Sequence, residues 1–200
     1  MKTRIFALVC ACTPILASAQ VTPIGPFTGS LQEGWESHTL GQFLPTLDIF
    51  GGAGDATQLA AGQGLHVTTG WGFFSTTFPH SGGRFMGGAG VNYALNFDNP
   101  ASQFGAYFQT NADAPDAMAT FFDANNAQIG GSVVISAPQG QWQWNGFEYA
   151  QGISRIEIVA NNQFGGFIMI DDLEYNAVPE PGAFVALAAG LGLLLVRRKR

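Results

Sequence analysis

Apolar and polar residues alternate along several stretches in the middle of the chain. In residues 91–97, the apolar residues share one face of an extended chain, and they are Val91, Tyr93, Leu95 and Phe97. Alternation with a period of two is typical of a strand with one buried face. Residues 104–108 continue the pattern, and residues 132–136, 153–159 and 167–175 are further candidates. These stretches predict β-strands.

Turn-forming residues separate the strand candidates, as in Asp98-Asn99-Pro100 and Pro138-Gln139-Gly140. No amphipathic helical pattern lies between them, so the chain predicts an all-β fold, an antiparallel β-sandwich. Residues 121–129 predict a hairpin. Residues 41–64 are rich in glycine and alanine, and we expect them to form a long loop over one edge of the sandwich.

The N-terminal segment has a different pattern. Lys2 and Arg4 are followed by an apolar stretch, and residues 17–19 are the small residues Ala-Ser-Ala. This order is typical of a secretory signal peptide. We therefore predict a signal helix in residues 1–19, removed by signal peptidase before Gln20, and an exported protein.

Both cysteines of the chain, Cys10 and Cys12, lie in this segment. After its removal the protein would contain no cysteine, which excludes disulfides, cysteine metal sites and thiol nucleophiles. An exported domain without disulfides must be held together by its core alone or by a metal.

The C-terminal segment predicts a transmembrane helix. Residues 182–196 contain no charged residue, and a helix of that length spans about 22 Å, less than the ~30 Å of the hydrocarbon core. Such a helix suits a membrane stop during export better than a permanent anchor. The basic residues that follow would stay in the cytoplasm, and they are Arg197, Arg198, Lys199 and Arg200.

The order of features in residues 178–200 carries a family resemblance. Val178-Pro179-Glu180-Pro181, then the apolar helix and then the basic cluster resemble the PEP-CTERM sorting signal of Gram-negative bacteria. The resemblance implies recognition by an exosortase at the inner membrane, cleavage near the motif, and transfer to the cell surface or extracellular matrix. It leaves residues 20–177 as the β-sandwich domain. The alternative is an ordinary single-pass anchor without processing.

Without its two ends the domain is strongly acidic. Six of the eight Lys and Arg residues lie in the terminal segments, so Arg84 and Arg155 face 13 of the 14 acidic residues, a net charge near −11. Nucleic-acid binding needs clustered Lys and Arg, and this composition excludes it. The same charge disfavours anionic lipid surfaces.

The central domain has a second, looser resemblance. The stretches at 104–108 and 121–125 and the closing Ile170-Asp171-Asp172-Leu173 resemble jelly-roll domains of exported PEP-CTERM proteins. Those domains are similar in fold to carbohydrate-binding modules. The resemblance therefore implies a sandwich of jelly-roll type.

Acidic residues near the two ends of the domain suggest a calcium site. Period two places Asp171 on the face of Leu173 and Tyr175, and a buried carboxylate needs a partner or a cation. The jelly-roll resemblance implies a structural Ca²⁺ that joins Glu36 to Asp171 or Asp172, and oxygen ligands suit Ca²⁺. In the alternative, Asp171 accepts hydrogen bonds from backbone amides at a bulge, or a bulge turns it outward.

Aromatic residues supply candidates for sugar binding. Trp142 and Trp144 share one face of a strand, with amide side chains on the other face. Exposed indoles suit stacking on sugars, but tryptophan also packs well in a core, and Trp71 has the same ambiguity. The candidate glycan-binding residues are Trp71, Tyr107, Trp142 and Trp144.

Support for catalysis is weaker. The histidines His38, His66 and His80 lack metal-ligand spacing, and the pair His80-Ser81 has no evident third partner. Paired carboxylates for glycoside hydrolysis stay open, because their separation in space decides the mechanism. We expect a non-enzymatic surface or matrix protein that binds polysaccharide. One alternative is a purely structural matrix component, and another is a glycosidase or polysaccharide lyase.

Overall fold

The computed structural model describes residues 20–179, and all its regular elements there are β-strands. The predicted signal peptide, the predicted transmembrane helix and the sorting motif from Glu180 onward lie outside the described residues. Within the described part, no helix is long and apolar enough to cross a bilayer.

The strands follow one another along the chain as β1 (Thr22–Ile24), β2 (Leu31–Glu33), β3 (Phe43–Leu44), β4 (Thr46–Ile49), β5 (Gly54–Gln58), β6 (Gly64–Thr68), β7 (Trp71–Gly72), β8 (Thr76–Thr77), β9 (Phe85–Ala89), β10 (Tyr93–Thr110), β11 (Asp116–Phe122), β12 (Val133–Ser136), β13 (Gln143–Ala160) and β14 (Ile168–Ala177).

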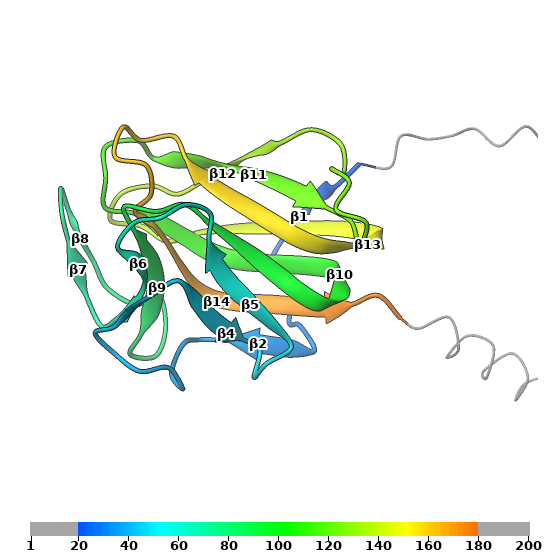
Figure 1. Ribbon diagram of the computed structural model, residues 1–200, viewed down its shortest axis with the longest axis horizontal. Helices are drawn as coiled ribbons and strands as arrows, with labels where there is room; N and C mark the ends of the chain where they lie inside the picture. Colours follow the sequence, from blue (N-terminus) through cyan, green and yellow to red (C-terminus); the bar gives the residue numbers. More distant parts are fainter. Residues whose placement is uncertain (1–19, 180–200) are drawn as a thin grey trace, which may run out of the picture.

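Two long strands, β10 and β13, form the centre of the fold. They pair with each other antiparallel along most of their length, with a shift in register between Asn96 and Ala101. Before this shift β10 pairs with β5, and after it β10 pairs with β14. Figure 1 shows the two strands running lengthwise, with β11 and β12 on one side and β14 on the other. Both strands therefore belong to both layers.

The pairings define the two layers. One layer has the order β12-β11-β13-β10-β5-β4, and the other has the order β1-β13-β10-β14-β9-β6-β3, with β2 also beside β14. Every pairing between these strands is antiparallel. The prediction of an all-β antiparallel sandwich is confirmed, while its jelly-roll type stays a prediction.

The core between the layers follows the predicted alternation. Val91, Tyr93, Leu95 and Phe97 all belong to it. The predicted hairpin of residues 121–129 is also present, because the Ile129 amide donates to the Phe121 carbonyl over 2.8 Å. Burial of the apolar side chains of this core is the main force that holds the two layers together.

The expected long loop at residues 41–64 is wrong. This segment contains β3, β4 and β5 and the first residue of β6. The core-facing positions include Gly54 and Ala56 beside Leu47 and Ile49. Small residues give little apolar contrast, and the strands are short, so the pattern is too weak to separate strand from loop.

A bulge in β14 reverses the face on which Asp171 was expected. Between the pairs Gly105–Glu174 and Tyr107–Asp171, β14 contains one more residue than β10. The left-handed φ of 46° at Asp172 fits such a bulge. As a result, Leu173 belongs to the core between the layers, while Asp171 shares the opposite face with Tyr107.

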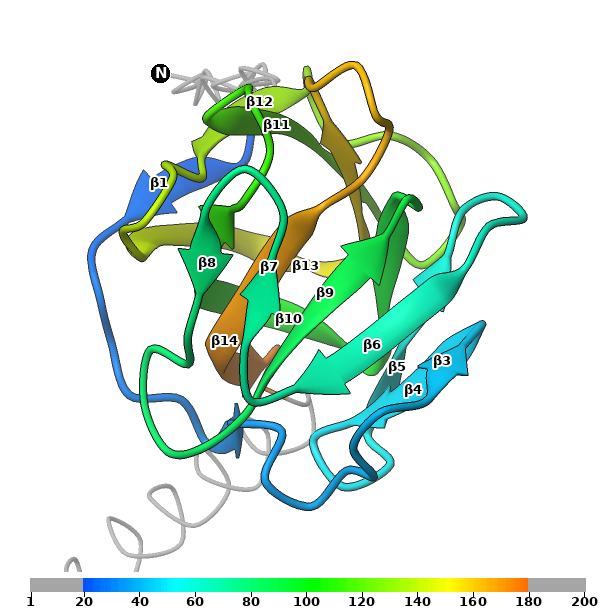
Figure 2. The same cartoon turned by 90° about the vertical axis from the view of Figure 1, so that its left-hand side faces the viewer.

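We call this opposite face of β13, β10, β14 and β9 the outer face. The hairpin of β7 and β8 lies in front of it in Figure 2. The loop of residues 78–84, which joins β8 to β9 and which we call the covering loop, also lies over it: the Trp142 indole donates to the Phe78 carbonyl over 2.9 Å. The outer face is therefore partly covered by the protein's own chain.

Candidate functional site

Trp144 lies flat on the outer face where two strands have glycine. Gly105 of β10 and Gly146 of β13 are in register. A methyl group at Gly105 would lie 2.5 Å from Cη2 of Trp144, and one at Gly146 would lie 2.6 Å from its Nε1. Glycine inside a strand often marks a place where another group approaches the backbone closely. These two glycines make room for the indole.

Contacts at its edges fix the Trp144 ring. Its Nε1 donates to the Ile24 carbonyl over 3.1 Å. Its centroid lies 5.3 Å from that of Tyr107 and 5.8 Å from that of Phe27, both in edge-to-face geometry. The residue is half-buried. The ring is thus positioned by the protein while part of its surface faces solvent.

A cavity of about 340 Å³ lies beside Trp144 and Tyr107, and we call it the aromatic cavity. Its polar wall includes Gln32, Asp172 and Glu174. Glu174 accepts hydrogen bonds from the Gly29 amide over 2.6 Å and from the Gln32 side chain over 3.0 Å. Apolar rings together with a few hydrogen-bonding groups are the usual make-up of a small-ligand site.

Trp142 is on the same outer face as Trp144. It is half-buried, packs edge-to-face on Phe85 at 5.8 Å and lies under the covering loop. Neither indole belongs to the core cluster between the layers. Core packing, the alternative for these two residues, is therefore not what the structure shows.

Trp71 lies on the β7–β8 hairpin, away from the aromatic cavity. A methyl group at Gly87 of β9 would lie 2.8 Å from the Trp71 ring, so this indole also covers a strand glycine. It contacts His66 and Phe167. The structure thus brings two of the predicted glycan-binding residues, Tyr107 and Trp144, into one cavity. Their role in binding stays a prediction.

The three acidic residues of the predicted calcium site converge on the covering loop. Asp171 accepts hydrogen bonds from the His80 and Ser81 amides over 2.8 and 3.4 Å, and from the Asp172 amide over 2.9 Å. Asp172 contacts Nδ1 of His80 at 2.5 Å and accepts from the Ser81 hydroxyl over 2.6 Å.

Glu36 holds the other end of the loop. Its carboxylate accepts from the Gly83 and Arg84 amides over 2.6 and 3.1 Å. Among residues 20–179, no three His, Cys, Asp or Glu side chains are grouped so that they could hold a metal ion. The backbone amides that donate hydrogen bonds to Asp171 match the alternative to a calcium site, in which this carboxylate accepts from backbone amides at a bulge. Calcium binding by Glu36, Asp171 and Asp172 stays a prediction.

Asp171 has no exposed surface. Burial, and after it the negative charge of Asp172, raise the pKa of Asp171 from an ordinary 3.8 to about 7, although the three backbone amides act in the opposite direction. A carboxyl group that changes charge near neutral pH is unusual and often has a functional reason.

His80 is the residue that sequence reasoning missed. Its ring stacks on Tyr107 with centroids 3.7 Å apart and planes 19° apart. Asp172 is the third polar partner that the sequence did not show for the pair His80-Ser81. It lies between the two side chains and hydrogen-bonds both. Because 92 positions separate His80 from Asp172, no local pattern could have joined them.

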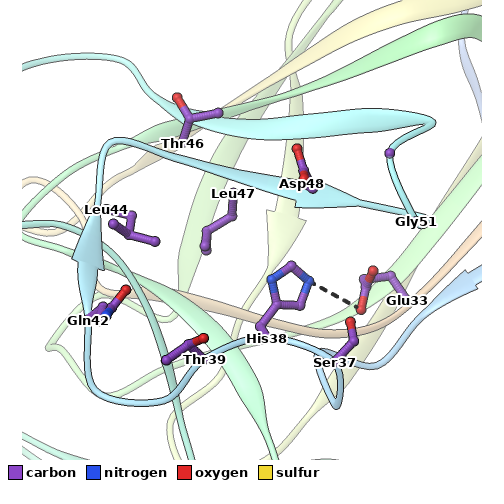
Figure 3. Close-up of a pocket in the computed structure, with 11 residues that line it drawn as sticks. Glu33, Ser37, His38, Thr39, Gln42, Leu44, Thr46, Leu47, Asp48 and Gly51 are labelled. Carbon is purple, nitrogen blue, oxygen red and sulfur yellow. Dashed lines mark ion pairs between the residues drawn. The ribbon is translucent and has the colours of Figure 1, made fainter.

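A second cavity, of about 470 Å³, lies between the β2–β3 loop and the β4–β5 hairpin. Figure 3 shows Glu33, His38 and Asp48 around it. Glu33 is buried and accepts from the Trp35 amide over 2.7 Å and the Phe50 amide over 3.0 Å, with His38 at 3.6 Å.

Opposing effects act on the pKa of Glu33. Burial alone would raise it, but His38 and the two amides favour the ionised form, and the pKa is lowered overall. The carboxylate is therefore fully engaged in joining two loops. None of the predicted glycan-binding residues lines this second cavity.

Comparison with known proteins identifies a fold but no family. No family model matches the chain, and no curated protein matches it. Among solved structures, the K2 cleaved adhesin domain of Lys-gingipain is similar, with a TM-score of 0.50 and 13% identity over 72% of this chain and 97% of that chain.

Two carbohydrate-binding modules are more distantly similar. TmCBM61, solved in complex with beta-1,4-galactotriose, has a TM-score of 0.45 and 15% identity over 72% of this chain and 94% of that one. The CBM22-1 xylan-binding domain from Paenibacillus barcinonensis Xyn10C has a TM-score of 0.43 and 12% identity over 78% and 99%. At these identities the likeness concerns the β-sandwich fold alone.

Proposed function

We propose that the protein is an exported, non-enzymatic β-sandwich of jelly-roll type that binds polysaccharide through the aromatic cavity. One observation carries the proposal: Tyr107 and Trp144 lie together in a cavity whose polar wall has Asp172 and Glu174. The fold by itself does not choose between a glycan ligand and a purely structural role. The aromatic cavity favours the glycan ligand.

The chemistry of the aromatic cavity suits a sugar. A pyranose ring presents C–H groups on its faces and hydroxyl groups around its rim. The Trp144 ring can stack on the C–H groups, and the carboxylates can accept hydrogen bonds from the hydroxyls. About 340 Å³ is near the lower end of small-ligand sites, which suits one or two units of a chain.

The charge of the domain narrows the ligand class. Only Arg84 and Arg155 oppose 13 acidic residues in residues 20–179. A polyanionic polysaccharide would be repelled by this surface. We therefore propose a neutral polysaccharide.

The test is a glycan array probed with the purified protein, neutral and acidic polysaccharides side by side. We expect binding to neutral glycans and at least a tenfold loss in Trp144→Ala, because central tryptophans dominate binding energy. Phe43→Ala is the matched control, since Phe43 is exposed on β3 and stacks on His66, outside the aromatic cavity.

Two results would overturn the proposal. Equal binding by the wild type and Trp144→Ala, or no binding at all, would leave the purely structural alternative. Shortening of a bound glycan would instead favour a glycosidase or lyase.

We also propose that residues 178–200 direct the protein to the surface of a Gram-negative cell through exosortase processing. The last strand ends at Ala177, and the Val178 amide donates to the Pro100 carbonyl over 2.9 Å. Pro179 is exposed, so the motif begins where the sandwich ends. Mass spectrometry of the protein from an exosortase-bearing host should detect loss of the C-terminal segment, and an intact Arg200 would contradict the proposal.

A further inference from the structure

Three aromatic rings line the aromatic cavity, and two of them stand at steep angles to the third. Phe27 and Tyr107 lie with Trp144 in its wall, and all three side chains are half-buried. The plane of Phe27 makes an angle of 85° with that of Trp144, and the plane of Tyr107 makes an angle of 67° with it. Rings set at such angles form a corner, in which a compact group can contact two rings at once.

The spacing of these rings suits a positive charge. The Trp144 centroid lies 5.8 Å from that of Phe27 and 5.3 Å from that of Tyr107. A cation is attracted to an aromatic ring when it lies over the ring face within about 6 Å of the centroid. A group placed in the corner can therefore lie within that distance of more than one ring.

The polar part of the same wall is negatively charged. Glu33, Asp172 and Glu174 line the aromatic cavity, and none of its lining residues is basic. The only two arginines of residues 20–179, Arg84 and Arg155, pair with carboxylates outside the cavity. The rest of the domain is also strongly acidic, and such a field draws cations toward the cavity.

Glu174 keeps its charge but has little hydrogen-bonding capacity left. Its two oxygens accept from the Gly29 amide over 2.6 Å and from the Gln32 side chain over 3.0 and 3.1 Å. Both donors are uncharged, and in the described part of the chain no basic side chain pairs with Glu174. A carboxylate has about four lone-pair sites, so these contacts use most of them.

The other two carboxylates are also engaged. Asp172 contacts Nδ1 of His80 and accepts from the Ser81 hydroxyl, and Glu33 accepts from two backbone amides. A ligand in the cavity therefore meets negative charge but few free acceptor atoms. Because no histidine lies against Glu174, this carboxylate is the main source of the attraction.

We propose that the aromatic cavity binds a small organic cation with a fully alkylated ammonium nitrogen, such as a trimethylammonium group. This group has no N–H to donate, so it needs no free acceptor atom. Its charge is attracted to the ring faces and to Glu174, and its methyl groups make apolar contacts with the rings. This second class of ligand goes beyond the proposed glycan function and rests on the cavity alone.

Other organic cations fit the cavity less well. A primary ammonium group has three N–H donors and a guanidinium group has five, and each needs acceptor oxygens. The oxygens of Asp172 and Glu174 are already bonded to donors of the protein. The volume of about 340 Å³ is near the lower end of small-ligand sites, which suits a compact cation with a short tail.

Choline and its uncharged carbon analogue, in which a tert-butyl group replaces the trimethylammonium group, are matched probes. The two molecules have nearly the same shape, and only choline is charged. In titration calorimetry with the purified protein, we expect choline to bind at least ~10-fold more tightly than the alcohol. Its affinity should also fall several-fold as sodium chloride rises from about 0.02 to 0.5 M. Equal affinities for the two probes, or no binding of choline, would overturn the proposal.

Two variants place the cation in the cavity. Trp144→Ala should remove most of the choline binding, and Glu174→Gln should weaken it roughly tenfold while leaving the uncharged alcohol unaffected. The matched control is Glu148→Gln, because Glu148 is an exposed carboxylate of β13 that lines a different cavity. Should Trp144→Ala fail to fold, Glu174→Gln and the pair of probes still decide. Wild-type affinity for choline in a folded Glu174→Gln would overturn the proposal.

Competition separates the cation site from the proposed glycan function. Both ligands need the Trp144 ring, so choline should displace a neutral glycan from the protein. If choline binds and no glycan does, the glycan function is wrong and the cation site stands. If glycans bind and choline neither binds nor displaces them, the cation site is wrong.

Discussion

Substitution of Gly105 by alanine tests whether the flat position of Trp144 depends on the strand glycines. The new methyl group would lie 2.5 Å from Cη2 of the indole, whereas ordinary contact begins near 3.4 Å. The ring would have to move by more than 0.9 Å, the difference between the two distances, because its Cζ2 atom lies even closer to the new methyl group. That displacement weakens its hydrogen bond to Ile24 and its contact with Tyr107.

The expected cost combines three terms. Overpacking costs roughly 1–3 kcal/mol, and the weakened hydrogen bond about 1 kcal/mol. Alanine also restricts the unfolded chain, which offsets roughly 0.4–1 kcal/mol. We expect a net loss of about 2 kcal/mol in the free energy of unfolding, or a fall of roughly 4–8 °C in Tm for a domain of this size.

Urea denaturation followed by tryptophan fluorescence measures this loss, and glycan binding should fall with it. Gly25→Ala is the matched control, because nothing lies within 4 Å of a methyl group there. The double variant Gly105→Ala/Trp144→Ala should lose little more stability than Trp144→Ala alone, since the clash is gone. If Gly105→Ala is as harmless as Gly25→Ala, or if the two substitutions are additive, the glycine does not position the ring.

Two further predictions concern the acidic residues. Glu33→Gln should lower the free energy of unfolding at pH 7 by roughly 1–3 kcal/mol, because Glu33 accepts two buried amides. Since folding lowers the Glu33 pKa from 4.5, this stabilisation is present above pH 4.5 and disappears as the pH falls through the lowered value. Chemical denaturation of the wild type and Glu33→Gln measures it. An equal difference in unfolding free energy between the two proteins at pH 7 and at pH 2 would contradict the prediction. The predicted calcium site at Glu36, Asp171 and Asp172 should give a higher Tm with calcium than with a chelator. An unchanged Tm would contradict this site and leave the backbone amides as the partners of Asp171.

Much of the fold could be predicted from alternation alone. The strand from Tyr93 to Phe97 and the hairpin around Asp123 have strong local patterns, because large apolar residues face the core and Asp123 accepts the turn amides. The strands between residues 43 and 58 could not be found, because glycine and alanine fill core positions there. The weak contrast between apolar and polar positions in this segment, and not a lack of burial, limited the prediction of these strands.

The site was predictable in its residue types but not in its arrangement. Trp142 and Trp144 share a face as expected. Asp171 is buried, but under the covering loop and not in the core between the layers. The bulge at Asp172 reverses the face of Asp171, and a single residue with left-handed φ leaves no mark on the period-two pattern. The contact of His80 with Tyr107 joins segments that only the folded chain brings together.

The passage of β10 and β13 through both layers has a consequence for how the molecule comes apart. In a sandwich made of separate sheets, one layer can loosen while the other stays paired. Here the pairing of Tyr93 with Ile158 in one layer and of Phe104 with Phe147 in the other belongs to the same two strands. Pro100 packs on Gly152 where the strands cross between layers. The two layers therefore share their two central strands. Loss of either layer exposes the central strands of the other, so we expect unfolding to be a single cooperative event.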